Sequence, residues 1–177
     1  RTAKISVDTN SILDNIDFML ENPDHIIGIP TGFPSLDKSF GGLRKGEIWT
    51  MGGESSSGKT YVVLQMMFNI AQHLKANNID QYAVMISLEM TKTQLMERLI
   101  GIVSGLNAKY ITHPMEYFID KQIPANEENI SILKSTIKKA TDLINSLSFI
   151  LDDSSELSAD EIVAISKKVQ LKNGLAC

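Results

Sequence analysis

One segment of the sequence combines residue types that could bind a chain of phosphates. Residues 53–60 match the pattern G-x-x-x-x-G-K-[ST] at every fixed position. Glycines allow a sharp turn that points successive backbone N–H groups inward, and small serines keep bulk away from a ligand. The Lys59 ammonium can reach the outer phosphates of a nucleotide, and the Thr60 hydroxyl can bind Mg²⁺. The candidate nucleotide-binding residues are Gly53, Glu54, Ser55, Ser56, Ser57, Gly58, Lys59 and Thr60.

A carboxylate further along the chain could act on water. Glu89 follows an expected strand, at the carboxyl edge of a parallel sheet, where open α/β sheets bind their ligands. Transfer of a phosphoryl group to water needs a residue that orients the water, and Glu89 is our candidate. The alternative is that Glu89 only stabilises a helix N-terminus through the helix dipole. The spacing alone does not separate these two interpretations.

The elements that must position these residues alternate along the chain. Apolar residues recur near the helical period after the phosphate loop, and short apolar runs separate the helical segments. Two capping-box patterns, Thr91 with Gln94 and Ser158 with Glu161, mark helix starts. Residues 105–127, with two prolines, are expected to be irregular. The expected strands cover residues 47–51, 82–87 and 149–151, and the expected helices cover residues 8–21, 59–76, 128–146 and 158–174, with another helix after Thr91.

Strands separated by helices predict crossover connections and a mainly parallel sheet flanked by helices, which is an α/β fold. Residues 8–21 open the chain as a short amphipathic helix, and Asn22-Pro23-Asp24 ends it. This helix either packs on its own domain or docks on a neighbouring subunit. At the other end, residues 175–177 are expected to begin a strand.

Composition excludes several classes of protein. The 177 residues are 43% hydrophobic and carry a net charge of -4, which rules out a disordered tail and a generally basic nucleic-acid coat. The single cysteine, Cys177, rules out an internal disulfide and favours a reducing cytoplasm. No apolar run is long enough for a membrane helix, so no membrane is expected as a partner.

The remaining titratable residues do not predict a metal centre. The three histidines have no Cys or His partner at the spacing that metal ligands require. Asp152-Asp153 is followed by Ser154-Ser155, which favours a turn at the end of a strand over a metal site.

Several short motifs together resemble a known family. Residues 28–33 (GIPTGF), Leu36-Asp37 and residues 41–43 (GGL), followed by the phosphate loop, are similar to the RecA-like ATPase superfamily. Residues 87–90 (SLEM) and the helix after them narrow the resemblance to the ATPase domain of DnaB-type replicative DNA helicases. The resemblance covers nearly the whole chain from Gly28. It implies a RecA-like P-loop NTPase core over residues 28–177, preceded by a linker helix and hinge over residues 1–27.

The resemblance also implies an activity. In that family the glutamate that matches Glu89 activates water, and the residues that match Lys59 and Thr60 hold the phosphates and Mg²⁺. We therefore expect Lys59 and Glu89 to be catalytic, with ATP and Mg²⁺ as cofactors. Members are homo-oligomeric, hexameric rings that hydrolyse ATP while moving 5′ to 3′ along single-stranded DNA at the replication fork. Primase and a helicase loader would be further partners, in a bacterial, phage-infected or organellar interior.

Two features of the sequence differ from the pattern of DnaB-type helicases and leave other hypotheses open. The loop sequence Glu54–Ser57 is nearer to RecA recombinases, so the alternative is a recombinase or clock-type RecA-like ATPase. The chain also ends where the family's metal-anchoring Asp strand, followed by its arginine finger and DNA-binding loops, should begin. We interpret it as a fragment that alone binds nucleotide poorly and turns it over little. A truncated, non-catalytic module that binds helicase subunits or loaders is the remaining hypothesis.

Overall fold

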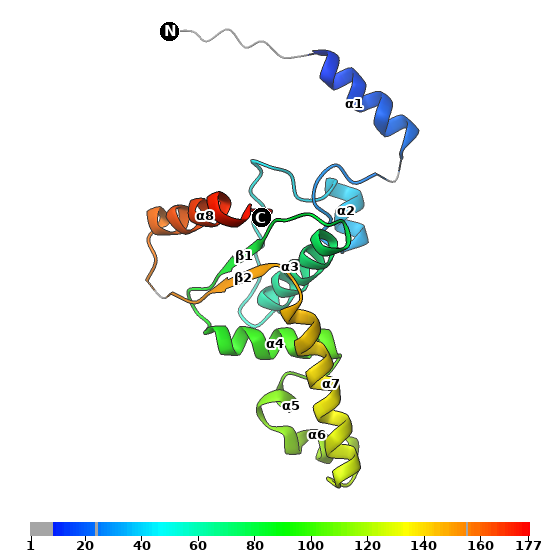
Figure 1. Cartoon of the computed structure of the whole chain (residues 1–177), viewed down its shortest axis with the longest axis vertical. Helices are drawn as coiled ribbons and strands as arrows, with labels where there is room; N and C mark the ends of the chain where they lie inside the picture. The colour runs from blue at the N-terminus through cyan, green and yellow to red at the C-terminus, as the bar shows by residue number, and fades with distance from the viewer. Residues whose placement is uncertain (1–8, 24, 155) are drawn as a thin grey trace.

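The computed structural model describes residues 9–23, 25–154 and 156–177, and within them helices surround a small parallel sheet (Figure 1). The strands are β1 (Ala83–Ile86) and β2 (Phe149–Asp152). The helices are α1 (Thr9–Glu21), α2 (Pro34–Phe40), α3 (Lys59–Ala76), α4 (Lys92–Ser104), α5 (Lys109–Thr112), α6 (Pro114–Lys121), α7 (Glu127–Asn145) and α8 (Ala159–Asn173).

The sheet is parallel, as the alternation of elements predicts. β1 and β2 pair in register from Ala83 opposite Phe149 to Ile86 opposite Asp152. The C-terminal residues continue the sheet on the other side of β1, because Leu175 forms a parallel bridge with Tyr82. The expectation that residues 175–177 begin a strand is therefore consistent with the backbone pairing.

The strand expected over residues 47–51 is wrong for the described part of the chain. Residues 47–51 have no strand assignment, and Ile48 is 92% exposed. An apolar cavity of about 760 Å³ is lined by Trp49, Thr50 and Met51 as well as by residues 84–86 of β1. A strand is defined by its backbone pairing, and these residues pair with no strand among those described.

Helix α3 holds the two parts of the core together. On one face Met67, Ile70 and Leu74 pack with Ala83 of β1. Around the helix, Phe68 packs with Leu99 of α4 and Ile144 of α7 in a second cluster. The helix that begins at the phosphate loop is therefore fixed against both the sheet and the α4–α7 pair.

A buried polar network fastens α3 to the chain before it. The side chain of Asp37, 5% exposed, accepts hydrogen bonds from the N–H and hydroxyl of Thr31 (2.8 and 2.7 Å) and from the N–H of Gly32 (3.0 Å). Asn69 of α3 donates to the carbonyl of Thr31 at 3.0 Å. A Cβ on Gly32 would lie 2.2 Å from the Asn69 amide, so this close approach needs glycine.

Three short helices lie where the sequence did not indicate them. Helix α2 was not predicted, and α5 and α6 replace the irregular structure expected over residues 105–127. Pro34 and Pro114 both stand in the first turn of a helix, where proline's missing N–H costs nothing. Of the two prolines that suggested irregular structure in residues 105–127, Pro114 instead starts helix α6.

Helix α1 covers Thr9–Glu21 of the residues 8–21 that the sequence predicts, residue 8 lying outside the described residues, but the structure does not support packing on its own domain. Five of its described apolar side chains are between 45% and 75% exposed, Met19 is partly buried, and the helix points away from the sheet in Figure 1 (blue). The five exposed side chains are Ile12, Leu13, Ile16, Phe18 and Leu20. Among the residues that the structure describes, no helix combines the length and apolar character needed to cross a membrane.

Candidate functional site

The phosphate loop reaches α3 through two left-handed backbone positions. Ser56 has φ 62°, and Gly58, which immediately precedes the helix, has φ 91°. A Cβ on Gly58 would meet no atom within 4 Å, so the requirement for glycine here comes from the backbone conformation alone. Loop residues 53–57 are exposed, which leaves their backbone accessible to a ligand.

The first turn of α3 keeps its backbone donors free. Gly58 offers no side chain to cap the helix, and the first hydrogen bond into the loop is the one from the Val62 N–H to the Gly58 carbonyl (3.1 Å). The N–H groups of residues 59–61 donate to no acceptor in the described ranges. Free N–H groups at a helix N-terminus, together with the helix dipole, favour an anion such as a phosphate.

The Lys59 ammonium lies over the same loop. Its Nζ donates to the carbonyl of Gly53 at 2.9 Å and to that of Glu54 at 2.7 Å. Both acceptors are neutral, and a phosphate oxygen would form a stronger, charge-assisted hydrogen bond with the same ammonium. The Lys59 ammonium can therefore exchange its hydrogen bonds to the loop carbonyls for hydrogen bonds to a phosphate.

Glu89 lies in the turn between β1 and α4. The turn starts at Ser87, whose N–H donates to the carbonyl of Asp152 at the end of β2 (2.8 Å), and the Ser87 hydroxyl accepts from the Met90 N–H (3.0 Å). The Glu89 side chain is exposed and has no hydrogen bond or ion pair within the described segments. Its carboxylate is thus available to accept a hydrogen bond from water.

The turn ends in the capping box that the sequence predicts. The Thr91 hydroxyl accepts from the Gln94 N–H at 3.3 Å, and the Gln94 side chain accepts from the Thr91 N–H at 3.1 Å. Helix α8 has the same arrangement between Ser158 and Glu161, also as predicted. Both predictions succeed because a capping box depends on residues three positions apart.

The phosphate helix and the Glu89 turn border one cavity. A polar hollow of about 370 Å³ is lined by Tyr61, which follows Thr60, and by Met90, which follows Glu89. The guanidinium of Arg98 on α4 lies 5.5 Å from the centre of the Tyr61 ring, a cation–π contact that joins α4 to α3. The cavity therefore reaches one residue beyond each candidate segment, whereas Lys59, Thr60 and Glu89 themselves are not among its lining residues.

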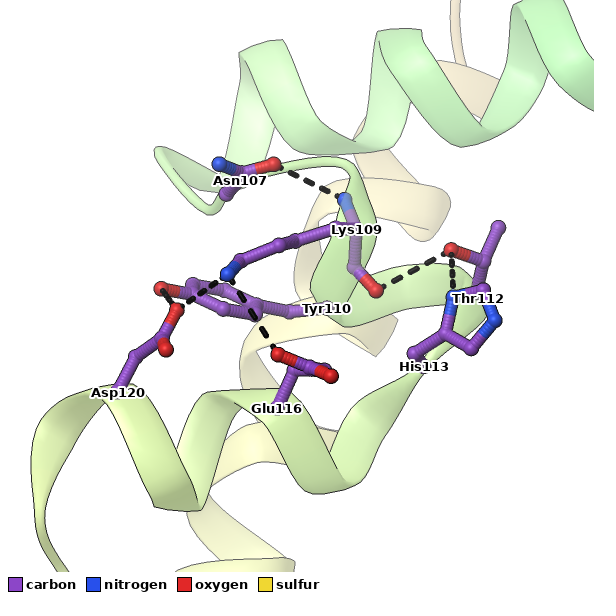
Figure 2. Close-up of polar contacts among 7 residues, drawn as sticks. All are labelled: Asn107, Lys109, Tyr110, Thr112, His113, Glu116 and Asp120. Atoms are coloured by element: carbon purple, nitrogen blue, oxygen red, sulfur yellow. Dashed lines mark hydrogen bonds and ion pairs between the residues drawn. The ribbon is translucent and has the colours of Figure 1, made fainter.

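A second polar cluster lies on α5 and α6 (Figure 2), and sequence reasoning missed it. Asp120 pairs with the Lys109 ammonium and accepts from the Tyr110 hydroxyl at 2.8 Å, while Glu116 lies 3.6 Å from the same ammonium. The hydrogen bond with Asp120 raises the pKa of Lys109 and of Tyr110, and the hydrogen bond from Lys109 lowers the pKa of Asp120. All four residues belong to the two short helices, so the cluster joins α5 to α6.

The aspartate pair at the end of β2 forms a turn, as the sequence favours. Asp152 accepts from the Ser154 N–H at 2.9 Å, and hydrogen bonding to Ser154 lowers the pKa of Asp152. Over the described ranges, no group of three or more His, Cys, Asp and Glu residues is arranged to hold a metal ion.

A parallel sheet with helices around it and a glycine loop that opens a helix define the class of P-loop α/β folds. Two solved structures share this fold. One is an isolated ATPase domain with a TM-score of 0.73 and 22% identity, covering 96% of this chain and 54% of that one. The other, a DnaB-like replicative helicase solved for its interactions with primase, has a TM-score of 0.71 and 24% identity, covering 97% of this chain and 36% of that one.

Sequence comparison identifies the family to which the chain belongs within this fold class. Residues 28–177 match the model of the DnaB-like helicase C-terminal domain, and the chain belongs to that family. The replicative DNA helicase DnaB of Rickettsia bellii (strain RML369-C) is 27% identical over 177 residues, or 97% of this chain. The chain spans 33% of that relative's length. The resemblance to DnaB-type helicases is confirmed, and the matches favour it over a recombinase or clock-type protein.

Proposed function

We propose that residues 28–177 form the N-terminal part of the ATP-hydrolysing motor domain of a replicative DNA helicase, and that residues 1–27 are its linker helix and hinge. The family match over residues 28–177 supports the helicase assignment. The observation that carries the nucleotide-binding role is the uncapped start of α3, where the N–H groups of residues 59–61 have no acceptor among the described residues and the Lys59 ammonium lies over an exposed loop.

The residues present fit a magnesium–nucleotide complex. The backbone of residues 53–58 and the first N–H groups of α3 would hold the phosphate oxygens, and the Lys59 ammonium would neutralise charge on the outer phosphates. The Thr60 hydroxyl would be a ligand of Mg²⁺. When bound, ATP and Mg²⁺ would supply the phosphoryl group and the Lewis acid for hydrolysis.

Glu89 would act on the attacking water. Its carboxylate is exposed, has no partner in the described part of the chain, and lies in a turn that borders the same cavity as the start of α3. The carboxylate oxygen would accept a hydrogen bond from water, orient it, and take its proton as the phosphoryl group is transferred.

The proposed assembly is a hexameric ring of identical chains that moves along single-stranded DNA in the cytoplasm or an organelle interior. The exposed apolar side chains of α1 support docking of this helix on an adjacent subunit. Primase and a helicase loader are proposed as partners, and the DnaB-like helicase solved for its interactions with primase supports the first.

The experiment compares ATP hydrolysis and strand unwinding by the full-length protein with those of Lys59→Ala and Glu89→Ala. We expect both variants to lose both activities, whereas Lys134→Ala and Glu128→Ala, which change exposed side chains on α7, keep them. A wild-type protein that hydrolyses no ATP with single-stranded DNA present would overturn the helicase proposal. Wild-type rates in the Lys59 or Glu89 variant would instead show that the assigned role is wrong.

A further inference from the structure

Asp153 connects the end of β2 to the start of α4, 61 residues earlier in the chain. Its Oδ2 accepts a hydrogen bond from the backbone N–H of Lys92 at 2.9 Å, and its Oδ1 lies 3.3 Å from the Lys92 ammonium. The Asp153 side chain is 30% exposed and that of Lys92 is 55% exposed. Lys92 is the first residue of α4, so the carboxylate binds one of the helix's unpaired N–H groups.

This contact adds to the hydrogen bonding of the turn that contains Glu89. Three successive N–H groups, those of residues 90–92, donate to the side chains of Ser87, Gln94 and Asp153. Ser87 and Gln94 belong to the turn and its own helix, whereas Asp153 immediately follows strand β2. Asp153 is therefore the side chain that fixes this turn to the sheet.

The neighbouring residue holds the other end of the same turn. The carbonyl of Asp152 accepts from the Ser87 N–H at 2.8 Å, so Asp152 and Asp153 bind the first and last residues of the segment 87–92. Glu89 lies between these two fixed points. Movement of the whole segment relative to β2 would require these two hydrogen bonds to break.

We propose that Asp153 is a positioning residue that holds Glu89 in the orientation needed to act on water, an inference that rests on the proposed function. The effect comes through the bond to the Lys92 N–H, because the ion pair with the Lys92 ammonium is exposed and screened. A small displacement of a reacting group is enough to slow a reaction by an order of magnitude or more.

Substitutions at two positions separate the backbone bond from the ion pair. Asp153→Ala removes the acceptor, and Lys92→Pro removes the donor while leaving the carboxylate in place. Proline is suited to this position, because Lys92 is the first helical residue and Thr91 has φ −70° and ψ 156°, an extended conformation compatible with a following proline. Lys92→Ala removes only the ammonium, and Asp153→Asn keeps an acceptor oxygen.

In the full-length protein we expect Asp153→Ala and Lys92→Pro to lower kcat for ATP hydrolysis by about tenfold with KM unchanged, since Glu89 acts on the reaction and not on nucleotide binding. Asp153→Asn and Lys92→Ala should stay within about threefold of wild type. Asp142→Ala, which breaks the exposed pair with Lys138, is the matched control and should leave kcat unchanged.

A second measurement does not depend on turnover. Hydrogen–deuterium exchange of the nucleotide-free protein should be faster in the segment 87–95 for Asp153→Ala than for wild type, and near wild type for Lys92→Ala. Unchanged exchange and a kcat within twofold of wild type for both Asp153→Ala and Lys92→Pro would overturn the positioning role.

The Glu89→Gln variant distinguishes this failure from failure of the proposed function. If Glu89→Gln abolishes turnover while Asp153→Ala does not lower it, the function stands and the positioning role is wrong. If Glu89→Gln retains wild-type turnover, the proposed role of Glu89 is wrong and the inference falls with it. Adding Asp153→Ala to Glu89→Gln should lower kcat no further, because the two residues act on one step.

Discussion

Helices α3 and α4 both begin beside the polar cavity, but they differ in whether the backbone N–H groups at their N-termini have hydrogen-bond acceptors. At the start of α3, the N–H groups of residues 59–61 have no acceptor within the described residues. At the start of α4, the N–H groups of Lys92 and Gln94 donate to the side chains of Asp153 and Thr91, while that of Thr93 has no acceptor in the described ranges. The N–H groups of residues 90 and 91, just before the helix, donate to the side chains of Ser87 and Gln94.

The difference shows that identical backbone groups serve two purposes. Donors that the chain leaves free are available to an external anion, as at the loop of residues 53–58. Donors that the chain satisfies hold a turn in one shape, as around Glu89. A site that must bind phosphate and place a carboxylate needs one helix start of each kind.

The largest expected effect is on nucleotide binding at the N-terminus of α3, where the backbone N–H groups have no acceptor within the described residues. Lys59→Ala should weaken the affinity for magnesium–ATP by about 2–4 kcal/mol, or about 30- to 1,000-fold, because it removes a charge-assisted contact to the phosphates. Titration calorimetry of the full-length protein measures this change. Lys75→Ala, at the other end of α3, should not alter the affinity, and equal losses in the two variants would contradict a local role for Lys59.

A smaller effect should follow when the loop's backbone is strained. Gly58 has φ 91°, so Gly58→Ala should cost about 1–2 kcal/mol and lower nucleotide affinity by about 5- to 30-fold. Gly105, which ends α4 with φ 70° and also has open space around it, is the matched control. Urea unfolding should report similar losses for Gly58→Ala and Gly105→Ala, whereas only the first should weaken binding in calorimetry.

Removing the N-cap of α4 should affect the stability of the protein more than its affinity for nucleotide. Thr91→Ala should lower the free energy of unfolding by about 1 kcal/mol, because the Gln94 N–H loses its acceptor. Ser158→Ala removes the equivalent cap of α8 and should cost a similar amount in urea unfolding. A nucleotide affinity reduced by Thr91→Ala as strongly as by Gly58→Ala would remove the distinction between the two helix starts.

The smallest expected effect depends on pH. The hydrogen bond from the Lys92 N–H is the main cause of a lowered pKa for Asp153 in the folded chain. A carboxyl group with a depressed folded pKa adds stability above its unfolded pKa, about 3.9, and that contribution is lost as the pH falls through the lower folded value. The stability advantage of wild type over Asp153→Asn should therefore be constant near neutral pH and vanish in acid, as followed by urea unfolding at a series of pH values. An advantage that grows in acid would contradict it.

Local signals predicted much of this arrangement. The start of α3 after the glycine-serine loop and both capping boxes depend on residues within a few positions of one another, and the structure places these helix starts where the sequence indicates. The contact between Lys92 and Asp153 joins residues 61 positions apart, and no local sequence pattern predicts it. The strand expected at residues 47–51 failed for a related reason, since strand formation depends on a distant partner that the apolar run does not reveal.

The helix α6 and its cluster show a second limit. Pro114 is read from sequence as a breaker of regular structure, yet at the first position of a helix it is favoured. The pairing of Lys109 with Asp120 depends on the angle between two short helices, which the turn at His113 sets. Neither the turn nor the pairing follows from spacing alone.

The tie between Asn69 and the Thr31–Gly32 turn restricts how α3 can respond to an occupied N-terminus. Rotation of α3 about its long axis would pull the Asn69 amide from the Thr31 carbonyl, and sliding would press it into Gly32, where there is no space even for a methyl group. Thr31 is itself anchored to Asp37 inside the protein. A shift of α3 that keeps this hydrogen bond would therefore carry the turn at residues 31–37 with it, toward the segment that leads back to α1.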